Sequence, residues 1–297
     1  MTGNRSLLLP LLAGLAATVV VLLAFGGHYL FGQSGKTEPD TLSYPPSILR
    51  TSLKPPDNPA MEKPPGFLPP ESVSVPILVY HNIAPHRPTE SKMQQIFTVS
   101  PQMFDRQLRF LADSGYHPIL PQLMRDVLDG TAQLPDKPVM LTFDDGWRTQ
   151  YENAYPLLEE FGFKAVFYVF TNPMLHDNNR YLSWDMLSEM ESHGMAVGSH
   201  SVTHPYLKKS SDEELTRELT QSRRSLEQNL GHQVYDFAYP FGQVDGRISA
   251  AVAQAGYLTA RTLVHRTVAT KKSLLELGGY IVTENFADFT GIFEVKK

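Results

Sequence analysis

Two adjacent carboxylates, Asp144 and Asp145, follow an uninterrupted apolar run, Val139-Met-Leu-Thr-Phe143. Such a run is typical of a strand buried on both faces, and open α/β enzymes place reactive groups at the carboxyl ends of such strands. Successive strand residues point in opposite directions, so both acids can serve one site only if the chain turns there, which Gly146 permits. An Asp-Asp-Gly turn is also a common way to end a strand, so the acids alone do not establish a site.

Two histidines four residues apart, His200 and His204, follow a second expected strand, Met195–Ser199. On a helical turn this spacing puts both imidazoles on one face, close enough to share a metal ion. A pair of surface histidines on a loop is the alternative. Two histidines with one carboxylate form a three-ligand set that leaves a position for water, as catalytic zinc requires. The chain has no cysteine, so a metal depends on such ligands, and Zn²⁺, Co²⁺ or Ni²⁺ would fit them.

Strands and helices alternate along the folded part. Apolar patterns predict strands at 75–81, 116–120, 139–143, 164–170, 195–199, 234–238 and 257–262. Helical periodicity predicts helices at 101–116, 121–128, 151–161, 183–193, 211–230 and 246–255, with Ser100, Ser183 and Ser211 as N-caps. The alternation predicts an α/β fold with a parallel sheet, and about seven units favour a closed or nearly closed barrel over an open sheet.

The amino-terminal part has a different composition. Leu7–Phe25 is free of charged residues and would span about 28 Å as a helix, enough for the hydrocarbon core of a bilayer. We expect residues 1–31 to be a signal anchor or transmembrane segment, 32–74 to be a Pro-rich linker, and 75–297 to be the catalytic domain outside the cytoplasm. A cleaved signal peptide, which would give a secreted protein, is the alternative. The net charge of −5 argues against a nucleic-acid partner.

Two motifs carry a family resemblance. Thr142-Phe-Asp-Asp-Gly146 and His200-Ser-Val-Thr-His204-Pro resemble the first two motifs of the polysaccharide deacetylases, the family 4 carbohydrate esterases with a NodB-homology domain. The likeness covers about Ile77 to Val282. It implies a distorted parallel (β/α) barrel, with Asp144 as the general base and Asp145, His200 and His204 as metal ligands.

A third motif of that family matches incompletely. In Phe237-Ala-Tyr-Pro-Phe-Gly242, Pro240, Phe241 and Gly242 fit the motif, and the resemblance gives the Phe241 N–H an oxyanion-binding role. Ala238 stands where the family has an arginine that orients the base. Tyr239 and Phe241 could stack on a sugar ring, and Trp147 is expected to line the cleft.

The resemblance also requires a histidine as general acid. Leu263-Val-His265 matches the usual Leu-x-His string, but it lies in a basic segment with the marks of an exposed loop. His81 ends an expected buried strand at the front of the domain, as in deacetylases of biofilm poly-β-1,6-N-acetylglucosamine, in which this strand is circularly permuted to the front. We therefore expect His81 to be the acid, on the side of the metal away from Asp144, and His265 to lie outside the cleft.

The expected activity is a metal-dependent N-deacetylation of N-acetylglucosamine units in an extracellular polysaccharide, with release of acetate. The resemblance favours poly-β-1,6-N-acetylglucosamine as the substrate. Deacetylation of peptidoglycan or chitin oligomers and removal of O-acetyl groups from xylan stay open. A glycan-binding protein without turnover is a further alternative, which the presence of Asp144 and all three ligands disfavours.

Overall fold

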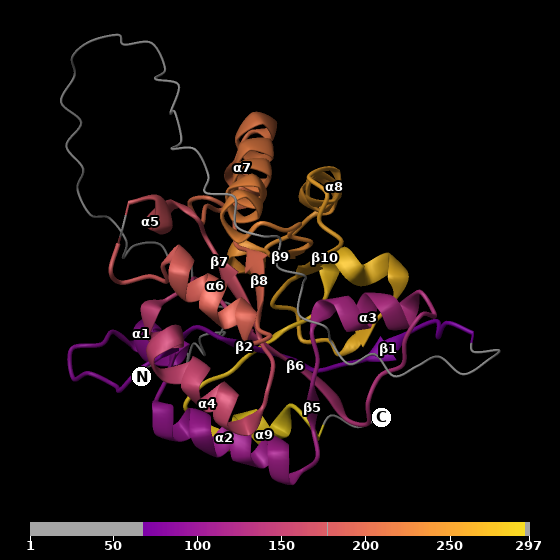
Figure 1. Cartoon of the computed structure of the whole chain (residues 1–297). Coiled ribbons are helices and arrows are strands. Elements are labelled where there is room, and N and C mark those ends of the chain that lie inside the picture. The colour runs from indigo at the N-terminus through magenta and orange to yellow at the C-terminus, as the bar shows by residue number, and fades with distance from the viewer. Residues whose placement is uncertain (1–67, 177, 295–297) are drawn as a thin grey trace, which may run out of the picture. The chain divides into compact units, whose positions relative to one another are not determined.

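The computed structural model describes residues 68–176 and 178–294, all within the second of two units, 1–45 and 46–297, into which the chain divides (Figure 1). The expected anchor, Leu7–Phe25, and most of the expected linker lie outside these residues. In the described ranges, no helix combines the length and the apolar character needed to cross a bilayer.

A curved parallel sheet forms the centre of the domain, with the strand order β10-β9-β8-β7-β6-β2-β12. Its strands are β2 (Ile77–Tyr80), β6 (Pro138–Phe143), β7 (Val166–Val169), β8 (Ala196–Ser199), β9 (Asp236–Ala238), β10 (Thr259–Arg261) and β12 (Tyr280–Ile281), and β5 (His117–Pro118) pairs with β6. The Thr262 N–H donates to the Leu277 carbonyl and the Leu277 N–H to the Ala260 carbonyl, both at 2.8 Å. Strand β10 is thereby bonded to the segment that leads into β12. The expected nearly closed β/α barrel is confirmed in outline.

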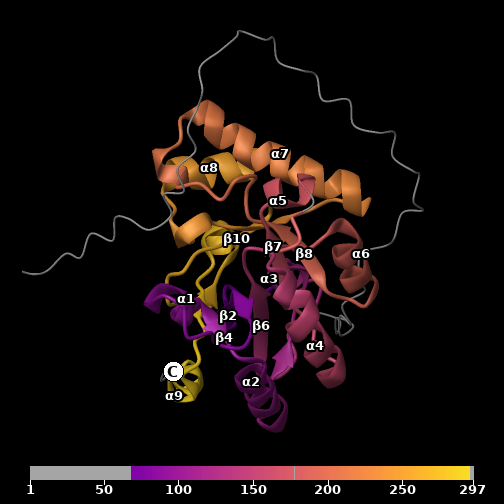
Figure 2. The ribbon, with the colours of Figure 1, turned by 90° about the vertical axis from the view of Figure 1, so that its left-hand side faces the viewer.

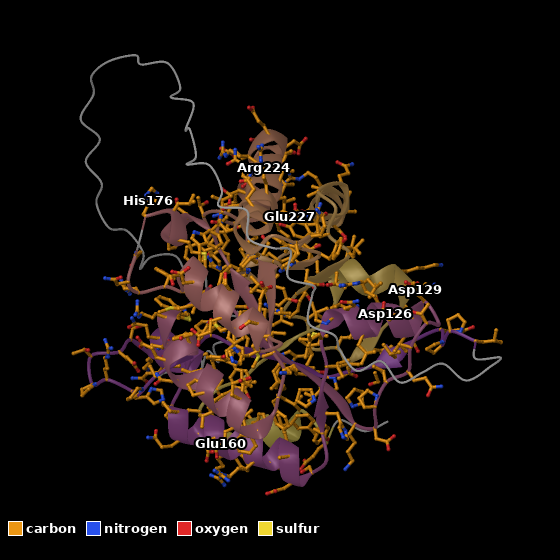
Figure 3. All side chains as sticks on the ribbon, in the orientation of Figure 1. Asp126, Asp129, Glu160, His176, Arg224 and Glu227 are labelled. Carbon is orange, nitrogen blue, oxygen red and sulfur yellow. The ribbon has the colours of Figure 1, made fainter. Side chains whose placement is uncertain are left out.

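The helices surround this sheet, and six of them agree closely with the sequence prediction. They are α2 (Pro101–Asp113), α3 (Pro121–Leu128), α4 (Tyr155–Phe161), α6 (Trp184–Ser192), α7 (Asp212–Leu230) and α8 (Gly246–Gln254). The side chains of Ser100, Ser183 and Ser211 accept the expected capping hydrogen bonds. Helices α7 and α8 lie together at one end, and α2 and α9 (Phe286–Gly291) lie at the other (Figures 1 and 2). Charged side chains such as Glu160 and Arg224 lie on the outside (Figure 3).

Several elements were not expected. They are the helices α1 (Lys92–Phe97), α5 (Asn172–Leu175) and α9, the strand β12, the 3₁₀ turns Leu207–Lys209, Pro240–Gly242 and Lys271–Glu276, and the pairs β1 (Val73–Ser74) with β11 (Val268–Ala269) and β3 (Asn82–Ile83) with β4 (Thr98–Val99). Strand β1 lies within the stretch 32–74 that was expected to be linker, so the ordered part begins before residue 75. The helix expected from Tyr151 begins as a π-helix, Gln150–Ala154.

The strand ends are held by aromatic packing directly beneath the candidate site. Tyr80 stacks on Phe143 at 5.3 Å between ring centroids, and Phe143 stacks on Phe167 at 4.7 Å. All three rings are buried, and each belongs to a different neighbouring strand. Tyr80 and Phe143 immediately precede His81 and Asp144, so this stack fixes the backbone from which both side chains project.

Candidate active site

The two adjacent acids reach the same site because the chain turns between them. Asp144 follows β6 directly, and Asp145 has the left-handed φ of 71°, which aspartate tolerates better than most residues. Gly146 continues the turn with a φ of 68°, and a Cβ there would lie 2.9 Å from the Val169 side chain. The turn therefore needs glycine at position 146, and it brings both carboxylates to the mouth of the barrel.

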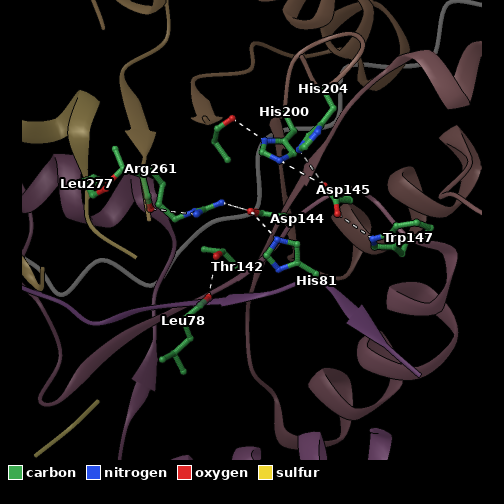
Figure 4. A network of polar contacts seen from close by, with 12 residues as sticks. Leu78, His81, Thr142, Asp144, Asp145, Trp147, His200, His204, Arg261 and Leu277 are labelled. Atoms are coloured by element: carbon green, nitrogen blue, oxygen red, sulfur yellow. Dashed lines mark hydrogen bonds and ion pairs between the residues drawn. The ribbon is translucent and has the colours of Figure 1, made fainter. Parts of the chain in front are cut away.

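Asp145, His200 and His204 converge, as the sequence predicted. The His204 Nε2 lies 3.5 Å and the His200 Nε2 lies 3.7 Å from the Asp145 Oδ1 (Figure 4). One ligand atom from each residue lies within 4.8 Å of the others. Two ligands bound at about 2.1 Å to one tetrahedral ion would lie about 3.4 Å apart, so these separations fit a divalent metal.

The protonation of His200 also fits a metal ligand. Its Nδ1 lies 2.7 Å from the Ala238 carbonyl oxygen, which can only accept, so Nδ1 carries the proton and Nε2 keeps its lone pair. Burial lowers the pKa of His200 to about 4, although the charges of Asp144 and Asp145 act in the opposite direction. Burial likewise lowers the pKa of His204. Both imidazoles are thus neutral at pH 7 before any metal binds.

The two histidines come together through a loop, and the helical turn that we expected is wrong. Ser201 and His204 have left-handed φ values of 73° and 57°, and the His204 N–H donates to the Ser201 Oγ at 2.9 Å. Glu218, a buried residue of α7, accepts hydrogen bonds from the N–H groups of Val202 and Thr203 at 2.9 and 2.8 Å, and from the Thr203 hydroxyl. This carboxylate, distant in sequence, holds the loop in a shape that backbone preference alone would not favour.

Asp144 is held by an arginine that the sequence analysis did not identify. The Arg261 Nη2 lies 2.6 and 2.5 Å from the two carboxylate oxygens of Asp144, and both residues are buried (Figure 4). Burial by itself raises the pKa of Asp144, but the neighbouring Arg261, His200 and His81 together outweigh it, Arg261 most strongly, and the pKa is lowered. Asp144 is therefore ionised at neutral pH, the state a general base requires.

Arg261 lies on another strand and takes the place of the arginine that the third family motif would have at position 238. Strands β9 and β10 pair in parallel, and Arg261 is the register partner of Ala238. The two positions are side by side at the carboxyl edge, so a long side chain on β10 can serve where β9 carries only a methyl group. A sequence signal existed, since Thr259-Ala-Arg261 is a short strand that ends in a charge, like the strands that precede Asp144 and His81.

The structure separates the two candidate histidines. The His81 Nε2 lies 3.9 Å from the Asp144 Oδ2, and its side chain is 13% exposed. His265 is exposed in the segment after β10 and packs on Tyr280 at 4.8 Å. His81 is thus a neighbour of Asp144, and the expectation that it stands away from Asp144 is wrong. The register explains this, because Tyr80 pairs with Phe143 and the next residues are His81 and Asp144.

Comparisons with known proteins agree with this geometry. Residues 131–260 match the family described as polysaccharide deacetylase. The deacetylase PplD of Streptococcus pyogenes, solved in complex with acetate, is 28% identical with a TM-score of 0.69, and the match covers 76% of this chain and 99% of PplD. Residues 131–260 thus form a polysaccharide deacetylase domain.

Two curated relatives are matched over smaller shares. YxkH of Bacillus subtilis, which is named for the same family, is 26% identical over 62% of this chain and 62% of its own length. The poly-β-1,6-N-acetyl-D-glucosamine N-deacetylase of Staphylococcus aureus strain N315 is 24% identical over 61% of this chain and 66% of its own length. The chain thus spans somewhat less than two thirds of these relatives.

Aromatic residues flank the cluster of Asp145, His200 and His204 on two sides. On one side, the Trp147 Nε1 donates to the Asp145 Oδ2 at 3.1 Å, and the Trp147 ring stacks on Tyr181 at 4.9 Å. On the other side, the Phe241 ring lies 4.6 Å from the His204 ring and stacks on the Tyr206 ring at 3.9 Å, both measured between ring centroids. Trp147 therefore also orients a candidate ligand, a role that its position after the Asp-Asp-Gly turn did not reveal.

The residues of the third motif divide into exposed and buried ones. Phe241 has a left-handed φ of 60° and is 41% exposed at the rim, consistent with the substrate contact that we expect. Tyr239 is 1% exposed, and its hydroxyl donates to the Leu275 carbonyl at 2.8 Å. The prediction that Tyr239 stacks on a sugar ring is therefore wrong, because the Tyr239 ring is part of the core. Pro240 is also buried and shapes the turn.

Proposed function

We propose that this chain is a metal-dependent N-deacetylase of N-acetylglucosamine units in an extracellular polysaccharide, with poly-β-1,6-N-acetylglucosamine as the favoured substrate. The observation that carries the proposal is that two groups of residues lie together. Asp144, which is bound by Arg261, lies next to His81. Beside this pair, Asp145, His200 and His204 form an open set of metal ligands. The polysaccharide deacetylase family and a relative named for this substrate support it.

Asp145, His200 and His204 would hold the metal, and Zn²⁺, Co²⁺ and Ni²⁺ suit their nitrogen and oxygen atoms. When bound, the ion would polarise the acetamide carbonyl and make a water molecule in the site more acidic. The Trp147 N–H fixes the orientation of the Asp145 carboxylate, and the Ala238 carbonyl fixes that of His200.

The proton transfers belong to Asp144 and His81. Asp144 accepts a proton from the water that attacks the acetyl carbon, and Arg261 keeps this carboxylate ionised and oriented. The Phe241 N–H donates to the oxygen that becomes negative. Protonated His81 then donates a proton to the glucosamine nitrogen as the carbon–nitrogen bond breaks. The products are acetate and a free amine, so the polymer gains positive charge.

Acetate release from defined oligomers tests the proposal. The full chain is incubated with β-1,6- and β-1,4-linked N-acetylglucosamine oligomers and with acetylated xylan, before and after chelation and after re-addition of Zn²⁺, Co²⁺ or Ni²⁺. We expect release from the β-1,6 oligomer to be fastest, to stop after chelation and to return with metal. Release that is fastest from β-1,4 oligomers or xylan would overturn the substrate, and chelator-resistant release would overturn the metal dependence.

We further propose that the enzyme acts outside the cytoplasm, held at a membrane by residues 1–31, because Leu7–Phe25 is an uncharged run of spanning length. Fractionation of cells that produce the full chain tests this location. Recovery in the membrane fraction, with the domain accessible to external protease in spheroplasts, is expected. A soluble extracellular product that begins after Phe25 would instead establish signal cleavage.

A further inference from the structure

Gln150 lies where the hydrogen-bond ladder between β2 and β6 ends. The register runs from Ile77 with Met140 to Tyr80 with Phe143, and its last bond is donated by the Asp144 N–H to the Tyr80 carbonyl at 2.9 Å. The chain then leaves the sheet through the left-handed turn at Asp145 and Gly146. The carbonyl groups of the next two residues, His81 and Asp144, are therefore left beyond the backbone ladder.

The side chain of Gln150 supplies hydrogen bonds to both carbonyl groups. Its Nε2 donates to the His81 oxygen at 2.8 Å and to the Asp144 oxygen at 2.5 Å. Because both partners can only accept, the amide nitrogen must face them. The amide thereby ties together the backbones of the two residues that the proposed mechanism uses for proton transfer.

This arrangement is costly for the fold. Gln150 is fully buried, and its Oε1 has no hydrogen-bond partner among the described residues. A buried acceptor without a partner destabilises a protein. An apolar side chain of similar length would remove this unpaired oxygen, but it would leave the carbonyl groups of His81 and Asp144 without their hydrogen bonds.

The neighbours of Gln150 hold the same piece of chain. The Thr149 hydroxyl donates to the Asn82 Oδ1 at 2.7 Å, and the Asn153 Nδ2 donates to the Ile83 carbonyl at 2.7 Å. Three side chains of the π-helix and its N-cap thus bind three consecutive residues after β2, beginning with His81. Single π turns are rare and occur frequently at functional sites.

We propose that Gln150 is a positioning residue that replaces the missing rung of the ladder and sets the His81 imidazole against the Asp144 carboxylate. Their closest separation, from Nε2 to Oδ2, is 3.9 Å. The inference rests on the proposed function, because it assigns His81 and Asp144 as the acid and base. A misplacement of about 1 Å at a reacting group can cost about 100-fold in rate.

Gln107 offers a matched control. It is also fully buried, its Nε2 donates to one backbone carbonyl, that of Thr283, at 3.1 Å, and its Oε1 likewise has no partner among the described residues. The variants Gln150→Met and Gln107→Met therefore remove the same chemical groups from equally buried positions. Only Gln150→Met releases the carbonyl groups of His81 and Asp144.

We expect Gln150→Met to lower kcat about 100-fold with KM within threefold, and Gln107→Met to leave kcat within twofold although it also lowers Tm. In a His81→Ala background, the fold-loss in kcat caused by Gln150→Met should be clearly smaller than in the wild type, since only Asp144 is then left to be positioned. An unchanged kcat in Gln150→Met, or an equal loss with and without His81, would overturn the inference. If Gln150→Met does not fold, Gln150→Asn, whose shorter amide cannot reach both carbonyls, replaces it with a smaller loss expected.

A readout without substrate separates this inference from the proposed function. The imidazole ¹⁵N signals of His81, assigned with His81→Ala, are compared at one pH in the wild type and both variants. A changed signal in Gln150→Met alone supports the positioning role even if the wild type releases no acetate from any oligomer, in which case only the proposed function fails. An unchanged signal in Gln150→Met refutes the positioning role.

Discussion

Replacement of Arg261 by methionine tests how the base is held. The Arg261 Nη2 contacts both oxygens of Asp144, and the two residues are only 1% and 3% exposed. Methionine retains much of the apolar stem and loses the guanidinium group. The Asp144 carboxylate would then be left buried, with burial raising its pKa and its main positive neighbour gone.

The size of the effect follows from this burial. Truncation of one partner in a buried ion pair costs about 3–5 kcal/mol of stability, because the remaining charge has no partner. We expect the free energy of unfolding of Arg261→Met to fall by this amount. Base catalysis is worth about 10²–10⁴ in rate, so we expect kcat to fall at least 100-fold, with a smaller change in KM.

Urea denaturation and acetate release measure the two effects, and a second substitution separates them. Asp144→Asn combined with Arg261→Met removes both charges, so it should recover about 2 kcal/mol or more of the lost stability while activity stays abolished. Arg224→Met, at an exposed position on α7, is the control and should change neither quantity. An Arg261→Met variant with wild-type kcat would refute the role of this arginine. A double variant no more stable than Arg261→Met would refute the buried ion pair as the cause.

Three further predictions concern the ligands, the loop and the acid. His204→Ala should abolish stoichiometric Zn²⁺ binding, measured by elemental analysis after dialysis; full occupancy would remove His204 from the ligand set. Glu218→Ala should weaken Zn²⁺ binding about 10–100-fold in a competitive chelator titration, because it releases the loop before His204, whereas Glu213→Ala on the same helix should not. His81→Ala should retain its metal and lose about 10²–10⁴ in kcat, while His265→Ala should stay within twofold. The reverse pattern of the two histidine variants would make His265 the acid.

Local signals in the sequence were sufficient for most of the elements. The capping serines and the apolar runs located the major helices and strands, because these preferences act over a few neighbouring residues. The same locality explains where the prediction stopped. The short helix Lys92–Phe97 buries no residue, so it has no apolar stripe from which it could be predicted.

The site was predictable wherever a reactive side chain ends a strand that has a clear pattern. His81, Asp144 and His200 all follow such strands, and in a parallel sheet these ends meet at one edge. The left-handed loop that brings in His204 depends on Glu218, which belongs to a later helix. Residue spacing carries no information about such a partner, so the helical turn was wrong although the two histidines do converge with Asp145.

Arg261 shows most clearly what one sequence does not contain. Its role depends on the register between β9 and β10, which places it beside Ala238, and on the closure of the sheet. In the strand order, β10 is four steps from β6, through β9, β8 and β7. At about 4.8 Å per step, the two strands would lie about 19 Å apart in a flat sheet.

An arginine side chain cannot cross that distance, yet its Nη2 lies 2.6 Å from the Asp144 Oδ1. The pair can form only because the sheet curls until β10 faces β6 across the mouth of the barrel, an arrangement that the hydrogen bonds between β10 and Leu277 maintain. Closure of the barrel is thus a condition for the chemistry as well as for the fold. The same closure places β12 beside β2, so the strand that carries His81 lies inside the sheet although it comes first in the chain.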